Sequence, residues 1–323
     1  MNDFFERQER YAQLKKEADA LNKTLLNELV ELVNAVLIEE GCPLINGSQI
    51  KFYPQYIGNT GIGEPIDSSL TNIIYDNYFP VAPSGQYAHF TDLIALESIL
   101  SKQKIRLTST IKRKDDWEFK LFYDDLNVTG FERPYRGGTY DDYLMNELFY
   151  LSVTENKEVG IDLKRGMWNH FGHAGTGVKM IFEIETSHRD FRQVFYQNAK
   201  SMEGKSLLHK LNDRIESRFG KPFVFNSLSK IGSFYISKCF QDEFESRFLI
   251  KKDSADYYFP FSIQHNGTIP FIELDFVSEW AIFRPIEIQP GFNCDRTAVE
   301  KIVASSGLAI KVLPNVSSAD LAK

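Results

Sequence analysis

The stretch YAHFTDLIALESILSKQKIRLTS, residues 87–109, sets the expected fold class of this chain. It predicts a strand from Tyr87 to Thr91, a helix from Leu93 to Lys102 and a second strand from Ile105 to Ser109. Thr91 or Asp92 is expected to cap the helix. Short strand-like runs and helices continue along the rest of the chain, without an internal repeat. This succession predicts an α+β protein with a mixed β core and flanking helices.

The composition agrees with that fold class. The chain has 323 residues, of which 43% are hydrophobic and 25% charged, so it can bury one large core or two smaller ones. It contains 26 Phe and 15 Tyr but only 5 Met. Aromatic side chains fit pleated surfaces well, so this composition favours a β-rich core over a helical bundle.

The later elements follow from the same periodicities. Further strands are expected at 148–153, 177–185, 193–196, 245–250 and 272–277, and further helices at 142–147, 205–219 and 298–305. Residues 286–314 predict a closing unit of strand, loop, helix and strand. Its Gly291 stands before the helix, but a phosphate cradle normally has more glycine, so we assign this residue a structural role.

The N-terminal region predicts one long helix from about Asp3 to Glu40, because leucine and valine recur at helical spacing and Gly41 then ends the helix. Its first half is polar nearly all round, so this helix either packs only by its second half or meets a protein partner. Residues 47–85 are rich in turn-forming residues and predict an irregular arm. The expected domains are therefore 1–80, the helix and arm, and 81–323, the core.

Charge and cysteine usage indicate a reduced, cytoplasmic protein. The three cysteines are far apart in the sequence, the N-terminus lacks the pattern of a signal peptide, and no apolar run is long enough for a membrane helix, so no membrane association is expected. The net charge of −7 disfavours broad nucleic-acid affinity. The basic run Lys112-Arg113-Lys114 is either a local binding patch or a solvated loop.

The first segment that could carry chemistry contains His89 and Thr91. These residues lie two apart on the expected strand and so point to one face. An imidazole beside a hydroxyl can hold a ribose diol. The alternative is a core histidine next to a helix-capping threonine.

The second segment runs from Leu148 to Ile184. Tyr150 and Ser152 share one strand face, and an aromatic group that includes Trp168 follows. Aromatic faces near a polar strand end suit a flat heteroaromatic ring, although a packed core is the alternative. His170 and His173 are spaced like metal ligands, but Gly172 weakens the helix between them and no acidic ligand has a matching offset, so no metal is expected.

The third segment is KCFQDEFESRFLIKK, residues 238–252. On a strand, Glu243, Glu245 and Arg247 would share one face, and carboxylates held so close need a compensating cation. The alternative is a solvated polar face on an edge strand.

Together, the three segments resemble an uncharacterised bacterial domain family with the running pattern Y-x-H-F-T, then M-W-x-H, then E-x-E-x-R. The match covers about residues 87–252. Lys114 to Glu118 and Phe240 depart from the turn and the tryptophan that members of that family usually have. The family is in turn remotely similar to the ADP-ribosyltransferases, including the toxins that modify nucleic acids.

The resemblance implies an ADP-ribosyltransferase-like fold and NAD as the substrate, without a metal. Glu245 would then be the catalytic carboxylate and Glu243 its partner in orienting the acceptor. Ribose binding and the nicotinamide pocket would fall to a set of strand and aromatic residues, namely His89 and Thr91 for the ribose and Tyr150, Ser152 and Trp168 for the nicotinamide. Three arginines would be candidates for gripping the pyrophosphate, namely Arg106, Arg165 and Arg247.

Two functions follow as alternatives. One is an enzyme that passes ADP-ribose to RNA, DNA or protein, acting as a toxin or a phage-defence effector. The other is a non-catalytic module of a defence or toxin–antitoxin system, which binds a protein partner through the acidic face and the N-terminal helix. A hydrolase with paired carboxylates would need a nucleophile or metal that the sequence does not offer.

Overall fold

The computed structural model describes residues 2–54, 60–63, 69–112, 121, 134–135, 137–157, 161–196, 207–221, 223–224, 228–237, 243–252 and 259–317. The chain forms two compact units, and the first division falls between Pro80 and Val81. Residues 197–232, which contain the helix Leu207–Phe219, belong to the N-terminal unit. Sequence analysis placed that segment in the core domain, because contacts between distant segments leave no mark in a local pattern.

The N-terminal unit is built on the long helix α1, Asn2–Glu39, which confirms the expected helix. Leu29, Val33 and Leu37, in its second half, are fully buried, whereas the described side chains before Leu14 are exposed. Gly41 ends the helix with a φ of 66°, a left-handed value that favours glycine. The other elements of the unit are β1 (Lys51–Pro54), β2 (Thr60–Gly63), α2 (Ser69–Tyr78), α7 (Leu207–Phe219), β11 (Phe223–Val224) and α8 (Leu228–Gly232).

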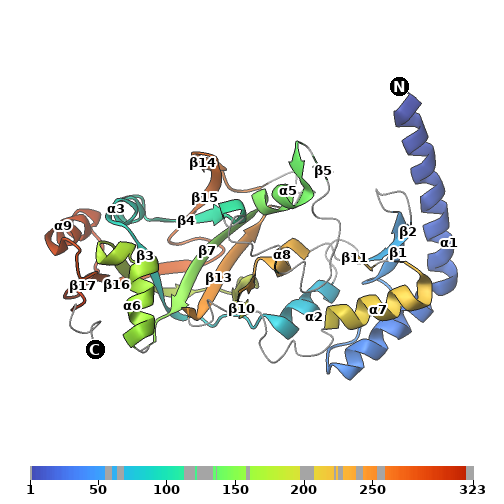
Figure 1. Cartoon of the computed structure of the whole chain (residues 1–323), viewed down its shortest axis with the longest axis horizontal. Helices are drawn as coiled ribbons and strands as arrows, with labels where there is room; N and C mark the ends of the chain where they lie inside the picture. Colours follow the sequence, from blue (N-terminus) through green and yellow to red (C-terminus); the bar gives the residue numbers. More distant parts are fainter. Residues whose placement is uncertain are drawn as a thin grey trace. The chain divides into compact units, whose positions relative to one another are not determined.

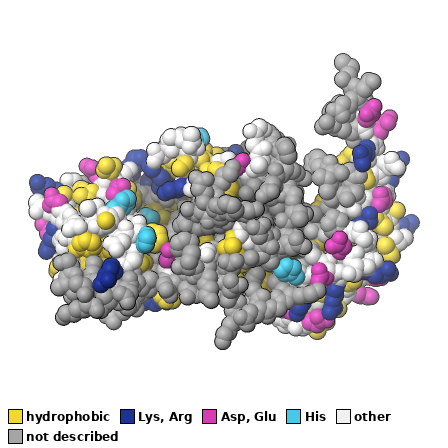
Figure 2. Space-filling view, in the orientation of Figure 1, with side chains coloured by type: hydrophobic (Ala, Val, Ile, Leu, Met, Phe, Trp, Pro, Cys, Tyr) yellow, Lys and Arg dark blue, Asp and Glu magenta, His cyan; other side chains and the backbone are white. Residues whose placement is uncertain are grey.

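Helix α7 packs against α1 and is joined to it by ion pairs along its length. Arg214 lies 2.6 Å from Glu39, and Lys221, just beyond α7, lies 3.1 Å from Glu17. Two further pairs are Lys210 with Glu40 and Arg218 with Glu28. Acidic and basic side chains are interspersed over this unit (Figure 2).

Among the described helices, α1 included, none is both long and apolar enough to span a bilayer. The strands of the N-terminal unit pair as β1–β2–β11, antiparallel between β1 and β2 and parallel between β2 and β11. The region expected to be an irregular arm therefore contains two short strands and α2. Turn-forming residues there mark the ends of elements too short for a clear periodicity.

The second unit holds a mixed sheet in which the described residues form ten strands. Strand β7, Leu148–Glu155, is its centre (Figure 1). One edge of β7 is paired along its length with β13, while β3 and β4 share the other edge. The remaining order is β4–β15–β14 on one side and β3–β8–β16–β17 on the other, and β9 follows β13. Their bounds are β3 (Gly85–Thr91), β4 (Lys104–Ser109), β8 (Val178–Glu185), β9 (Phe191–Gln193), β13 (Glu245–Lys251), β14 (Gln264–Asn266), β15 (Ile269–Asp275), β16 (Ile282–Pro290) and β17 (Lys311–Val312).

Smaller elements complete the second unit. Strand β16, helix α9 and strand β17 confirm the expected closing unit, since β16 and β17 are parallel. The helices and minor strands are α3 (Leu93–Lys102), α5 (Tyr140–Asn146), α6 (Ile161–His170), α9 (Arg296–Ser306), the 3-10 turn η2 (His173–Gly175), β5 (Pro134–Tyr135), β6 (Gly138–Thr139), β10 (Phe195–Tyr196) and β12 (Tyr235–Ile236).

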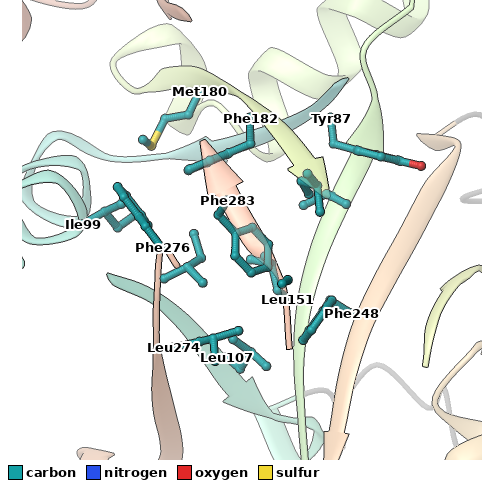
Figure 3. Packing of buried hydrophobic residues seen from close by; sticks show 14 of the residues in the cluster. Tyr87, Ile99, Leu107, Leu151, Met180, Phe182, Phe248, Leu274, Phe276 and Phe283 are labelled. Atoms are coloured by element: carbon teal, nitrogen blue, oxygen red, sulfur yellow. The ribbon is translucent and has the colours of Figure 1, made fainter. Parts of the chain in front are cut away.

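One face of this sheet carries the main hydrophobic core, which α3 and α9 help to close. Alternate residues of β7 and β13 contribute to it, such as Leu151 and Phe248, and aromatic residues of β8 and β16 meet them, such as Phe182 and Phe283. The Phe283 ring packs edge-to-face with Phe182 and with Phe248, at centroid distances of 6.4 Å and 5.5 Å (Figure 3). This packing explains the high aromatic content of the chain.

Candidate functional site

The three segments singled out in the sequence lie on neighbouring strands. His89 is on β3, Tyr150 and Ser152 are on β7, and Glu245 is the first residue of β13. Strand β7 stands between the other two, and Figure 1 shows β7 and β13 running side by side. Residues separated by more than a hundred positions in the sequence are therefore brought within one part of the sheet.

The strand register decides which side chains share a face. Thr154 on β7 is paired with Ala88 on one side and with Glu245 on the other, so these three residues point to the same face. Arg247 is likewise paired with Ser152. We call this the polar face, defined by Tyr150, Ser152, Thr154, Glu245 and Arg247, and it lies opposite the hydrophobic core.

Glu245 is held on the polar face by Arg247. Arg247 Nε donates to Glu245 Oε1 at 2.8 Å and Nη2 donates to Oε2 at 3.2 Å. The two side chains are only 2% and 1% exposed, so the charges compensate each other in a desolvated place. Arg247 also donates to the Ser233 carbonyl at 2.5 Å, and its guanidinium carbon lies 5.1 Å from the centre of the Tyr150 ring.

Tyr196 closes one end of this arrangement. Its hydroxyl accepts a hydrogen bond from the backbone N–H of Glu245 at 2.9 Å. Burial raises the pKa of Tyr196, and the nearby carboxylates of Glu245 and Glu243 raise it further. The hydroxyl therefore stays protonated, and both carboxylates of the E-x-E pattern lie close to it.

Glu243 is not on the strand, which corrects the expected alternation of Glu243 with Glu245. Strand β13 begins at Glu245, and the intervening Phe244 has a φ of 48°, a left-handed value that interrupts extended backbone. Lys157 Nζ lies 3.6 Å above the Phe244 ring. The side chain of Glu243 is half-buried and more accessible than that of Glu245.

His89 alternates with Ala88 on β3, so its side chain leaves the sheet on the face opposite Glu245. Its Nδ1–H donates to the Ser152 carbonyl at 3.1 Å, at the place where β3 and β4 diverge along β7. Burial lowers the pKa of His89, and the charge of Lys112 lowers it further, so the imidazole is neutral near pH 7. The contact between the first two segments thus runs through the backbone of Ser152.

Thr91 is buried and shares the face of His89, as expected from their spacing. It does not cap the following helix. The N-cap of α3 is Asp92, whose Oδ1 accepts from the Ala95 N–H at 2.7 Å. Of the two capping residues left open by the sequence, the aspartate has this role.

Trp168 is packed rather than open. It lies on α6, a helix that sequence analysis did not predict, and its ring is 1% exposed and edge-on to Phe90 at 5.1 Å. A Cβ added at Gly172 would lie 2.4 Å from the Trp168 ring, so the glycine permits this packing. Gly166 and the polar residues of α6 weaken its helical pattern, which is why the sequence did not predict this helix.

The other two arginine candidates lie on elements other than β13. Arg106 is exposed on β4, and its guanidinium carbon is 3.9 Å from the centre of the Phe271 ring. Arg165 is half-buried on α6. Sequence analysis missed Arg192 of β9, which is fully buried and paired directly with Arg247 across the strands. The short strand β9 gives too weak an alternation to mark Arg192 as inward-facing.

Gly291 has the structural role assigned from the sequence. A Cβ added there would lie 2.3 Å from the Gly175 carbonyl oxygen, so these two backbone segments approach each other too closely for any side chain. The Gly291 N–H donates to the Gly177 carbonyl at 2.9 Å.

Comparison of the chain with models of protein families finds no match, and neither does comparison with curated proteins or with solved structures.

Proposed function

We propose that this protein is an NAD-dependent ADP-ribosyltransferase that modifies a macromolecular acceptor, either nucleic acid or protein. One observation carries the proposal. The strands that bear His89, Tyr150 with Ser152, and Glu245 are consecutive neighbours in the order β3–β7–β13, with Tyr150, Ser152 and Glu245 on one face of the sheet and His89 on the other.

The chemistry uses a carboxylate near a ribose. The C1′–N bond to nicotinamide breaks, its electron pair leaves with the neutral nicotinamide, and the ribose becomes an oxocarbenium-like cation. A nucleophilic oxygen or nitrogen of the acceptor then bonds to C1′ and loses its proton. A fixed negative charge beside the ribose stabilises this transition state, and the proposal assigns it to Glu245.

The bond to Arg247 supports such a role by fixing the orientation of the carboxylate. Both oxygens of Glu245 accept from Arg247, so the plane of the carboxylate is fixed relative to the strand. The half-buried Glu243 would orient the acceptor at the more accessible end of the strand. Tyr150 and Ser152, on the same face, would line the nicotinamide pocket.

His89 contributes from the β3 side. Its neutral imidazole donates Nδ1–H to the Ser152 carbonyl, so this hydrogen bond fixes the tautomer with the proton on Nδ1. The same hydrogen bond ties β3 to β7 where they diverge. Because the His89 side chain leaves the sheet on the face opposite Glu245, its part in the proposed site is indirect: it holds the backbone of Ser152 in place.

The test measures release of nicotinamide from NAD by the purified full chain, with and without a bacterial cell extract. A second reaction with NAD labelled in the adenylate portion detects transfer to RNA, DNA or protein after separation of the three. We expect release by the wild type, and a loss of at least a hundredfold in Glu245→Gln and Ser152→Ala, because both act in the transition state.

Glu300→Gln is the matched control, since Glu300 is an exposed acid on α9 with a single ion pair to Arg296. It should release nicotinamide at the wild-type rate. Circular dichroism and thermal unfolding of each variant separate lost chemistry from lost folding. Unchanged turnover in a folded Glu245→Gln protein would contradict the proposal.

The burial of Glu245 favours a second candidate, a non-catalytic module that binds a protein partner. A carboxylate that is 2% exposed and bound through both oxygens serves the fold well without any substrate. In that case the protein would release no nicotinamide from NAD, and calorimetry would detect no NAD binding. The partner would instead depend on the exposed half of α1, and deleting residues 1–13 would abolish its binding.

A further inference from the structure

Phe244, just before β13, is an exposed aromatic residue in a costly backbone conformation. It is 38% exposed, and its φ of 48° is a left-handed value that a bulky side chain rarely adopts. Packing could offset that cost if the ring were buried, but much of Phe244 faces solvent. The fold therefore holds this residue in place at a cost to its own stability, as is typical of residues that contact a ligand.

Contacts with the end of β7 fix the position of Phe244. Its carbonyl accepts from the Glu155 N–H at 3.4 Å, at the end of the strand pair where β13 begins with Glu245 (Figure 1). Lys157 Nζ lies 3.6 Å from the centre of the Phe244 ring, and Glu155 Oε2 accepts from the same ammonium group at 2.9 Å. Lys157 thus covers one face of the ring, and Glu155 holds the lysine there. We call Phe244, Lys157 and Glu155 the Phe244 platform.

Amide side chains lie around the Phe244 platform. Gln193 on β9 donates from Nε2 to Glu155 Oε1 at 3.1 Å. Asn156, which follows β7, donates from Nδ2 to Gln86 Oε1 on β3 at 3.4 Å. The half-buried Glu243 precedes the aromatic residue and adds an acceptor. An amide group carries both donors and an acceptor, so this set matches the mixed donor and acceptor edge of a nucleobase.

The charges at the Phe244 platform favour a neutral planar ligand. An aromatic ring can take either a neutral ring or a cation such as a guanidinium group on its face. Lys157 already lies over the Phe244 ring, and a second cation on the other face would be repelled by the first. The net charge of −7 also disfavours a ligand that is held by many phosphate contacts. A single unpaired base needs few such contacts and stacks on an aromatic ring.

We propose that Phe244, with Lys157 behind it, stacks an unpaired base of a single-stranded nucleic acid, and that this base is the acceptor; the acceptor role rests on the proposed function. In the transfer, a base nitrogen that carries a hydrogen forms a bond to C1′ while nicotinamide leaves with the electron pair of the broken bond. The proton of that nitrogen passes to Glu243. A paired base has no free face for the ring, so a duplex binds more weakly than a single strand.

The experiment titrates the full chain into short, fluorescently labelled RNA and DNA single strands and into a duplex, and follows fluorescence anisotropy. Phe244→Leu removes the aromatic face and keeps an apolar side chain, whereas Phe244→Tyr keeps the aromatic face. Ile94→Ala is the control, because Ile94 is an exposed apolar residue on α3. We expect single-strand binding about tenfold weaker in Phe244→Leu, and wild-type binding in Phe244→Tyr and in the control. The tighter of the RNA and DNA arms identifies the nucleic acid.

Phe244→Gly separates binding from folding. Glycine adopts a φ of 48° without strain, so a ring that is held for a ligand predicts lost binding with a thermal midpoint at or above that of the wild type. A lower midpoint together with wild-type single-strand affinity would give the ring a structural role and overturn the inference.

The outcomes separate this inference from the proposed function. Single-strand binding that depends on the Phe244 ring supports the stacking site, even where no nicotinamide is released and the transferase proposal fails. Nicotinamide release by a wild-type protein that binds neither RNA nor DNA overturns the stacking site and leaves the transferase proposal standing. Transfer of labelled ADP-ribose to protein, lost in Phe244→Leu, also overturns it, because the ring would then hold a protein acceptor.

Discussion

Arg247 binds Glu245, the residue two positions before it on the same strand, through both carboxylate oxygens, and both side chains are almost completely buried. Side chains two apart on a strand point to one face, which makes this short-range pair possible. The pair is supported from outside the strand by the Ser233 carbonyl and by the Tyr150 ring.

Glu245→Gln is expected to destabilise the protein as well as to stop any chemistry. Removing one partner leaves the Arg247 charge buried without compensation, which costs about 3 to 5 kcal/mol of unfolding free energy. Urea denaturation followed by circular dichroism measures this cost. Glu300→Gln, in an exposed ion pair, should cost about 0.5 kcal/mol or less. Equal midpoints for the two variants would show that the buried pair is not a folding determinant.

Gly291→Ala should lower the thermal midpoint markedly. The new Cβ would overlap the Gly175 carbonyl oxygen at 2.3 Å, and neither backbone can move freely, so we expect a loss of about 1 to 3 kcal/mol. Gly85→Ala is the matched control, because no atom lies within 4 Å of a Cβ placed there. Differential scanning calorimetry compares the two. A similar midpoint for both variants would mean that the loop around Gly175 yields easily.

His89 should make stability depend on pH in the acidic range. Burial lowers its folded-state pKa below the ordinary value of 6.5, so below about pH 6.5 the unfolded chain binds the proton more readily than the folded one. Unfolding free energy therefore falls as pH decreases from 6.5 toward the folded-state pKa. His89→Gln should flatten this part of the profile in urea titrations, whereas Phe90→Leu should keep its slope. An unchanged slope in His89→Gln would assign the effect to other groups.

Asn22 is predicted to anchor β1 to α1. Its amide nitrogen donates to the Phe52 carbonyl at 2.8 Å, and its oxygen accepts from the Phe52 N–H at 2.9 Å. Asn22→Ala leaves both backbone groups without these partners, at a cost of about 1 to 3 kcal/mol. Thr24→Ala, which removes an exposed hydroxyl bonded to its own helix, should be nearly neutral. Chemical denaturation of the two variants distinguishes these expectations.

The fold class and many elements could be predicted from local pattern. The helix Leu93–Lys102 occurs with the expected bounds, and the long N-terminal helix and the closing strand–helix–strand unit are also present. Helix α6 was missed because its apolar residues are few and Gly166 interrupts them. Helix α2 was missed because turn-forming residues flank it on both sides.

The candidate site could be predicted only in part. The shared face of Tyr150 and Ser152, and that of Glu245 and Arg247, follow from a spacing of two on a strand, which is a local property. The sequence could not show that β13 pairs along β7, or that β3 pairs with the other edge of β7. These relationships depend on contacts between distant segments, which leave no periodic signal in the chain.

The amino-acid sequence by itself determined the alternation within each strand, the helix ends and the residue types that could carry chemistry, because steric and hydrophobic preferences act over a few residues. Only the tertiary structure decided that Ala88, Thr154 and Glu245 share a face while His89 leaves on the other, and that Arg247 neutralises Glu245 in a buried place. The reason is that strand register is selected by the packing of the whole core, where a shift of one residue would turn every side chain to the opposite face.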